Sequence, residues 1–157
     1  MVWRHVAAAS GLPFSESVLD RDDFIYDTEP PCRAVVTARD MDASKAHAFM
    51  GAVQLAFYRD GRDVTQPAVL AGIAAECGYP PDTFRTNLES DSMREETLTD
   101  FATAKSIGVS GFPTLGARRG EQLYLVTSGY VTDDVLEYRL AEIERLVTQR
   151  AMGSSPG

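Results

Sequence analysis

The sequence has few of the residues that form metal sites and disulfide scaffolds. Among its 157 residues there are two cysteines, Cys32 and Cys77, far apart in the chain, and two histidines, His5 and His47. Neither histidine has a Cys, Asp or Glu at metal-ligand spacing, so we expect no metal site. The cysteine count also excludes a disulfide-stapled secreted domain and favours a reducing cytoplasm.

Positive charge and long apolar runs are also scarce. The chain has 15 Lys and Arg against 23 Asp and Glu, a formal net charge of -8. This balance argues against a nucleic-acid partner, which would need a basic surface. No apolar run approaches the roughly 18 residues that would cross a bilayer, and the first residues do not form a secretory signal. We therefore expect a cytoplasmic protein with no membrane partner.

The apolar residues that are present follow a helical period over most of the chain. Hydrophobic residues make up 44% of the sequence, enough for the core of one domain or of one domain with an insertion. Helical spacing extends to about residue 107, and two alternating strands around the turn "RRGE" and a last helix then follow. The sequence thus predicts a helical domain over 1–107, a strand–strand–helix part over 108–150, and a disordered tail over 151–157.

The stretch "GVSGFPTL" at residues 108–115 places a proline where a strand should begin. Proline has no amide proton for a sheet ladder, so it is confined to edges, strand starts and bulges. Only about 5% of X–Pro bonds in folded proteins are cis. By itself, this stretch predicts an ordinary loop that enters a strand.

Four motifs in a fixed order carry a family resemblance. They are "PPCRAVVTARD" (30–40), "AFYRDGRDVTQPAVL" (56–70), "GVSGFPTL" (108–115) and "SGYVTDDVL" (128–136). Together they resemble the cytosolic branch of the DsbA-like thiol–disulfide oxidoreductases, over nearly all of residues 1–148. The resemblance implies an α/β, thioredoxin-like fold with a helical insertion domain, and a cis peptide bond before Pro113.

The chain departs from this family in one respect. Family members carry a strand and a helix with C-x-x-C before the position that corresponds to Met1, whereas no C-x-x-C occurs here. We therefore expect an incomplete sheet and a thiol–disulfide oxidoreductase-like protein that is catalytically incomplete as given, so its status as an enzyme stays uncertain.

Two candidate sites follow. Cys32 is the candidate catalytic residue, because the first turn of a helix and the neighbouring Arg33 favour a thiolate; the alternative is a buried cysteine that acts as a small hydrophobe. The resemblance implies a substrate-binding segment at Gly111, Phe112, Pro113 and Thr114. There the backbone of Phe112 would pair with an extended peptide or with glutathione, the one candidate cofactor.

Three functions stay open at this point. The first is disulfide exchange or isomerisation on protein or small thiols. The second is a glutathione-dependent isomerase or transferase on the same scaffold, although "SGYVTDD" replaces its usual Ser-Asp pair. The third is a non-catalytic peptide-binding or adaptor protein. Because the strand that begins at "FPTL" is apolar on both faces, we also expect a homodimer.

Overall fold

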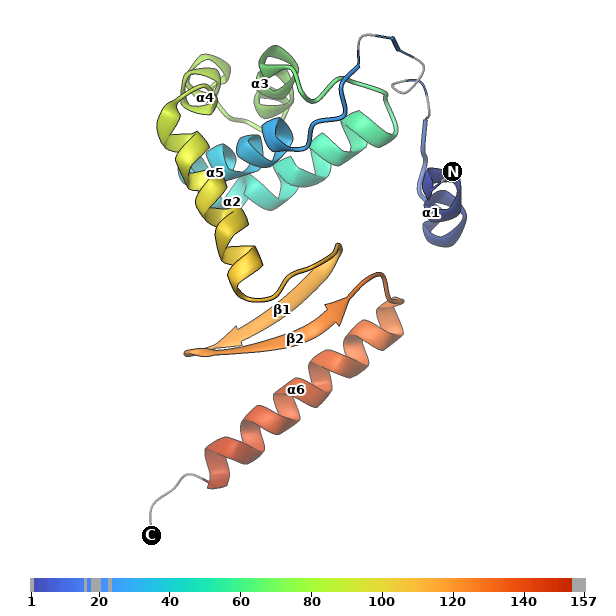
Figure 1. The fold of residues 1–157 in the computed structure, drawn as a ribbon, viewed down its shortest axis with the longest axis vertical. Coiled ribbons are helices and arrows are strands. Elements are labelled where there is room, and N and C mark those ends of the chain that lie inside the picture. The colour runs from blue at the N-terminus through green and yellow to red at the C-terminus, as the bar shows by residue number, and fades with distance from the viewer. Residues whose placement is uncertain (1, 16, 18–20, 23, 154–157) are drawn as a thin grey trace. The chain divides into compact units, whose positions relative to one another are not determined.

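The computed structural model describes residues 2–15, 17, 21–22 and 24–153. Its elements are α1 (Val2–Ser10), α2 (Glu29–Tyr58), α3 (Pro67–Glu76), α4 (Pro81–Leu88), α5 (Asp91–Ser106), β1 (Thr114–Arg119), β2 (Gln122–Ser128) and α6 (Asp133–Gly153) (Figure 1). None of the helices in these ranges is long and apolar enough to cross a membrane.

The chain divides into two compact units, Met1–Phe101 and Ala102–Gly157. We call them the helical unit and the hairpin unit and describe each by itself. The division falls inside α5, whereas the sequence placed the domain boundary at the end of this helix. At the other end, α6 continues to Gly153, so residues 151–153 of the expected tail are helical, and residues 154–157 lie outside the described part.

Helix α2 is two helices joined at Asp42. The sequence predicts that the helix through "CRAVVTARD" breaks around Asp40 to Asp42. This break is confirmed, because the backbone of Asp42 is extended, with φ -160° and ψ 94°. The Asp42 carboxylate then starts the second half, because its Oδ1 accepts the N–H of Ser44 at 3.1 Å and the Ser44 hydroxyl at 2.6 Å. Hydrogen bonds of this kind satisfy donors that a helix start leaves unpaired.

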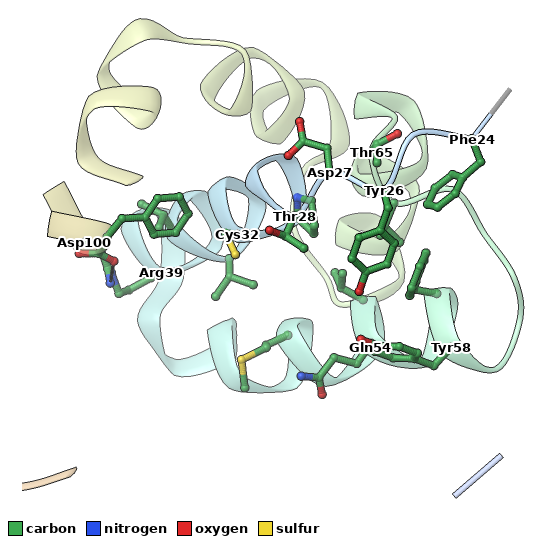
Figure 2. Close-up of a pocket in the computed structure, with 18 residues that line it drawn as sticks. Phe24, Tyr26, Asp27, Thr28, Cys32, Arg39, Gln54, Tyr58, Thr65 and Asp100 are labelled. Carbon is green, nitrogen blue, oxygen red and sulfur yellow. Dashed lines mark hydrogen bonds and ion pairs between the residues drawn. The ribbon is translucent and has the colours of Figure 1, made fainter. Parts of the chain in front are cut away.

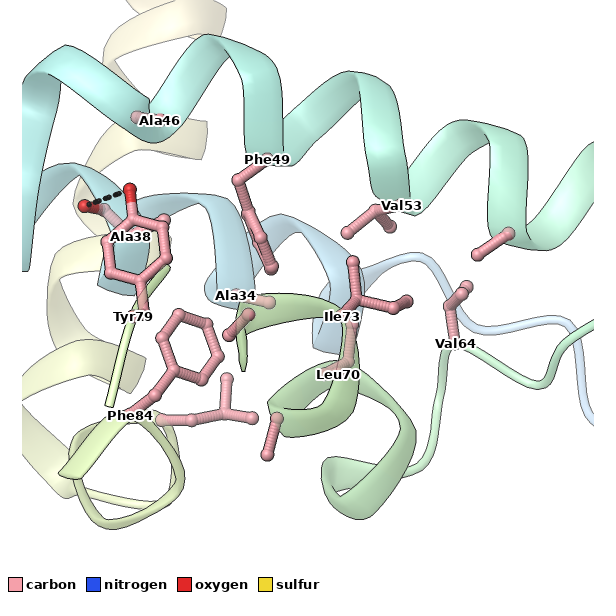
Figure 3. Close-up of a cluster of buried hydrophobic side chains, with 14 of the residues drawn as sticks. Ala34, Ala38, Ala46, Phe49, Val53, Val64, Leu70, Ile73, Tyr79 and Phe84 are labelled. Atoms are coloured by element: carbon pink, nitrogen blue, oxygen red, sulfur yellow. Dashed lines mark hydrogen bonds between the residues drawn. The ribbon is translucent and has the colours of Figure 1, made fainter. Parts of the chain in front are cut away.

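Tyr79 holds the two halves of α2 together. Its hydroxyl donates toward the carbonyl oxygen of Ala38 at 3.2 Å (Figure 3). It also donates toward the carbonyl oxygen of Asp42 at 3.0 Å. Both carbonyls lie next to the break, where the regular helical ladder is interrupted. The residue is 3% exposed, so the aromatic ring fills the core while the hydroxyl satisfies the interrupted backbone.

The core lies between α2, α3 and α4, which pack against one another (Figure 1). Phe49 is at its centre, with ring centroids 5.9 Å from Tyr79 and 5.3 Å from Phe84. The apolar stripes that the sequence predicts on these helices are confirmed as buried, including Phe84 and Leu88 of α4. The fully enclosed large side chains of this core are Phe49, Leu70, Ile73, Phe84 and Leu88 (Figure 3).

Two helix starts differ from the sequence-based expectation. The motif "SMRE" at residues 92–95 fits a capping box and predicts that α5 starts at Ser92, but the helix begins earlier, and the Oγ of Ser90 accepts the N–H of Met93 at 3.3 Å. The sequence also predicts Thr65 as the cap of α3, but Thr65 donates its own N–H and hydroxyl to Asp63, and Gln66 precedes the helix without a side-chain cap hydrogen bond. Polar side chains close by in the sequence thus compete for these hydrogen bonds, a choice that spacing alone does not resolve.

The hairpin unit contains an antiparallel pair of strands. β1 pairs with β2 from Thr114↔Ser128 to Arg119↔Gln122, with an irregularity between Leu115 and Gly116. Gly120 makes the turn with φ +59°, a conformation that favours glycine, and this confirms the predicted hairpin. α6 packs on β2, and Nη1 of Arg139 donates to the carbonyl of Val126 at 3.1 Å.

Candidate functional site

A pocket of about 420 Å³ opens in the helical unit. Its walls come from the loop before α2, from both halves of α2, and from the part of α5 at Asp100 and Phe101. Figure 2 shows Cys32 on the first half of α2 and Gln54 and Tyr58 on the second half, on either side of this space. Its size is within the range of small-molecule sites in proteins.

Aromatic side chains form one end of the pocket. The Phe57 ring lies 5.9 Å from that of Phe24 and 5.8 Å from that of Tyr26, and 5.5 Å from Trp3 of α1. Burial raises the pKa of Tyr58 to about 12, and its hydrogen bond with Tyr26 adds to the shift. The phenol of Tyr58 is therefore neutral at physiological pH.

An ion cluster forms the other end. Arg39 of α2 donates from Nη1 to Oδ2 of Asp100 at 2.7 Å and from Nη2 to Oε1 of Glu96 at 2.9 Å. These hydrogen bonds raise the pKa of Arg39. Because one guanidinium faces two carboxylates, the cluster as a whole is negative.

Cys32 lies in the pocket wall at the fourth position of α2. The residue is exposed, so its thiol can be reached from solvent. The pKa of the thiol is nevertheless raised, first by partial burial against the wall and then by the negative charges of Glu29 and Asp27. The raised pKa keeps the group a thiol at neutral pH.

The direction of this shift is opposite to the one that the sequence suggests for Cys32, and the helix start explains why. The amide of Glu29 donates to Asp27 Oδ1 at 2.9 Å and that of Cys32 to the carbonyl of Thr28 at 3.2 Å. Pro30 and Pro31 between them have no amide proton. This helix start thus offers no free amide to an anion, in contrast to an ordinary one.

The positive charge expected from Arg33 is also neutralised. Its Nε lies 3.2 Å from Oε1 of Glu29, within ion-pair distance but not aligned for a hydrogen bond. The side chain is 11% exposed, so the guanidinium packs into the protein and away from solvent. Sequence adjacency to Cys32 suggested a stabilising charge, but the adjacent carboxylates outweigh it.

Cys77 follows the end of α3 and is partly buried. Burial and then the charge of Glu76 raise the pKa of its thiol. Both cysteines are free, without a disulfide between them. Among the described residues there is also no group of three or more His, Cys, Asp and Glu that could hold a metal ion.

The segment 111–114 lies in the hairpin unit and ends at Thr114, the first residue of β1. Its Phe112–Pro113 peptide bond is cis, the isomer that the resemblance implies. The Pro113 carbonyl accepts the N–H of Gly129 at 2.7 Å, and the Thr114 hydroxyl donates to the Gly111 carbonyl at 2.7 Å. Phe112 itself is 87% exposed, and neither its N–H nor its carbonyl has a hydrogen-bond partner among the described residues.

The structure thus brings Gly111 to Thr114 into one ordered turn, while Cys32 belongs to the pocket of the other unit. Tyr26, Gln54 and Asp100, which also line this pocket, were missed from the sequence. They belong to a loop and to two helices far apart in the chain, and no motif or spacing connects them. The one available signal was Asp27 before "TEPP", which could have been recognised as a residue that occupies the helix start.

Comparison with known proteins gives two kinds of match. The chain matches the model of the "DSBA-like thioredoxin domain" family over residues 4–141. It also superposes on the crystal structure of a "putative protein disulfide isomerase" from Nitrosomonas europaea with a TM-score of 0.87 and 35% sequence identity, covering 92% of this chain and 71% of that one. No curated protein matches the chain.

A further likeness is one of fold. The cytosolic disulfide reductase DsbM from Pseudomonas aeruginosa superposes with a TM-score of 0.76 at 23% identity, over 92% of this chain and 73% of that one. A second structure of DsbM, with GSH, superposes with a TM-score of 0.74 at 23% identity, over 91% and 72% of the two chains. At this identity the likeness carries no residue roles.

Proposed function

Since this chain belongs to the DsbA-like thiol–disulfide oxidoreductase family, whose model covers residues 4–141, we propose that it binds an extended, thiol-bearing substrate at the segment 111–114. The fold predicted from the sequence, thioredoxin-like with a helical insertion, is confirmed by the match to the family and by the superposition on the Nitrosomonas europaea protein. The substrate, the partner and the degree of catalysis belong to the proposal.

The observation that carries the proposal is the unpaired backbone of Phe112. Its N–H and carbonyl have no partner among the described residues, and its side chain is 87% exposed. β1 begins two residues later and pairs with β2 on one edge. Such an arrangement supports the addition of an extended peptide along the free edge, with main-chain hydrogen bonds as the source of affinity.

We propose further that the chain by itself does not catalyse dithiol exchange. That reaction needs an attacking thiolate and a second thiol that resolves the mixed disulfide. The sequence has no C-x-x-C, and the raised pKa of both Cys32 and Cys77 keeps these residues protonated. Two free thiols without a disulfide support the proposal that the protein functions in a reducing cytoplasm.

Glutathione is the small thiol to test beside a peptide. One DsbM structure is with GSH, and the backbone of a tripeptide can pair with the same edge. A non-catalytic adaptor is the alternative in which peptide binding is the whole function. The binding and activity experiments below separate these possibilities.

The binding experiment uses a fluorescein-labelled extended peptide with an alkylated cysteine and follows its anisotropy as the protein is added. We expect saturable binding that is lost when alternate peptide amides are N-methylated, because the methyl groups remove the main-chain donors. Phe112→Pro removes the main-chain N–H of residue 112 and should weaken binding, whereas Phe112→Ala keeps this N–H and should bind nearly as well. Equal binding of the N-methylated peptide would refute strand addition.

The activity experiment compares insulin reduction and the refolding of a reduced substrate with a free-thiol control, with and without glutathione. We expect no rate above this control. Turnover that disappears in Cys32→Ser would restore Cys32 as a catalytic residue. Turnover that survives the replacement of both cysteines by serine would contradict the proposed chemistry altogether.

A further inference from the structure

The pocket of the helical unit has the character of a small-molecule site. We propose that it binds an apolar, largely aromatic molecule that carries no negative charge. This proposal does not depend on the substrate-binding segment 111–114, because every residue that lines the pocket belongs to the helical unit. Each of the two proposals can therefore fail without the other.

The lining sets the apolar character of the ligand. The walls are mostly aliphatic and aromatic, with Phe24, Val35, Met50, Val53, Phe57 and Phe101 among them. At about 420 Å³ the space exceeds that of a packing defect in a core and suits a molecule of up to three rings. Tyr26 and Tyr58 add ring faces for stacking and hydroxyl groups that can form hydrogen bonds.

The charges around the pocket determine which ligand charge it accepts. Asp27 lies in the lining, and among the residues that the structure describes no cation pairs with it. Asp100 also lies in the lining and shares the guanidinium of Arg39 with Glu96. The remaining neighbouring charges, Glu29 and Arg33, pair with each other. The mouth is thus negative overall, and a carboxylate or sulfonate would be repelled while a neutral or cationic molecule would not.

Cys32 provides a direct reporter of occupancy. It lies in the wall of the pocket, is exposed, and is the lining residue that carries a thiol. A ligand in the pocket should therefore shield Cys32 from alkylation. Cys77 does not line the pocket and serves as the internal control in the same molecule.

The experiment uses two probes that share one ring system. N-phenyl-1-naphthylamine is neutral, and 8-anilino-1-naphthalenesulfonate differs from it by one sulfonate. Titrated into the full chain, the neutral probe should show saturable fluorescence with one site per chain, and the sulfonate should bind roughly tenfold more weakly. The neutral probe should also slow the alkylation of Cys32 by iodoacetamide, measured by peptide mass spectrometry, and leave Cys77 unchanged.

Variants locate the site. Gln54→Trp fills the pocket from its rim and should abolish binding of the neutral probe, whereas Leu55→Trp, an exposed neighbour outside the lining, should not. Asp27→Asn should reduce the difference in affinity between the neutral probe and the sulfonate. Asp40→Asn removes the same charge outside the lining and should leave this difference unchanged.

The outcomes decide the proposal. Equal affinity for both probes, or binding that survives Gln54→Trp in a folded variant, would mean adsorption elsewhere and would overturn the proposal. Should Gln54→Trp not fold, the protection of Cys32 in the wild-type chain decides in its place. Slower alkylation of Cys32 with no change at Cys77 supports the site. Equal alkylation rates of Cys32 with and without the neutral probe refute it.

Discussion

The helical unit and the hairpin unit differ in how much apolar surface they bury. In the helical unit a continuous cluster from α2, α3 and α4 encloses Phe49, Leu70, Ile73 and Phe84 with no exposed area. In the described part of the hairpin unit, Val126 and Thr127 are the buried residues. There Leu115, Leu123 and Leu125 of the two strands are 41%, 49% and 67% exposed.

This difference shows which unit can fold on its own interactions. Burial of apolar area is the dominant favourable contribution to folding, and the helical unit has the larger share of it. A hairpin with one helix is near the lower limit of what is stable alone. The hairpin unit therefore depends more on what binds to it, which suits a substrate-accepting surface.

The largest expected effect is a core truncation in the helical unit. Phe49→Ala should lower the free energy of unfolding by about 3–5 kcal/mol, because it removes a fully buried ring at the centre of the cluster. Val126→Ala in the hairpin unit removes two methyl groups and should cost about 1.5 kcal/mol. Urea unfolding followed by circular dichroism measures both, and a larger cost for Val126→Ala would reverse the comparison.

The second effect concerns association. We expect a homodimer through the exposed strands of the hairpin unit. Leu125→Lys should weaken this dimer about tenfold or more, which corresponds to about 1.4 kcal/mol. Leu98→Lys, at a position of the helical unit that is 61% exposed, is the matched control and should not change the molar mass. Size-exclusion chromatography with light scattering measures the molar mass. A wild-type protein that is a monomer at all concentrations would contradict the predicted homodimer.

The third effect is smaller and tests the α2 break. Tyr79→Phe removes the hydroxyl that donates toward the carbonyls of Ala38 and Asp42, and it should cost about 1 kcal/mol of unfolding free energy. Tyr124→Phe in the hairpin unit loses a hydrogen bond to Gln122 at the surface and should be nearly neutral. Equal losses in urea unfolding would mean that the hydroxyl of Tyr79 does not hold the break.

The smallest effect is a pH dependence that should be similar in the two units. Hydrogen bonds from Ser44 and Lys45 lower the pKa of Asp42, and one from Thr132 lowers that of Asp134. Because each folded pKa lies below the ordinary 3.8, the stabilisation is present above that pH and is lost as the pH falls through the folded pKa. Asp42→Asn and Asp134→Asn should thus lower the melting temperature slightly at pH 7 and less in acid. A loss of melting temperature that is larger in acid than at pH 7 would contradict the predicted direction.

Much of the fold could be predicted, because its signals are local. The helical period placed Phe49, Phe84 and Leu88 in the core, and Gly120 marked the hairpin turn. The starts of α3 and α5 were wrong, since several Ser, Thr and Asp side chains compete for the same cap within a few residues. The order of the four motifs led to the family that the comparisons show.

The pocket could not be predicted, because its residues meet only in the folded chain. Arg39 pairs with Asp100 and Glu96, which follow it by 61 and 57 residues in the sequence. Tyr26 contacts Phe57 from an irregular loop. The direction of the pKa shift of Cys32 could not be predicted for the same reason. Its helix position and Arg33 are visible in the sequence, but partial burial and the carboxylates of Asp27 and Glu29 decide its pKa.

The sequence by itself thus determined the helices, the hairpin and the family, because the backbone period, turn residues and motif order act over short stretches of chain. The tertiary structure decided which residues line the pocket and what raises the pKa of each thiol. Those properties depend on distances between side chains that are remote in the sequence, and both burial and Coulomb energies change steeply over a few ångströms.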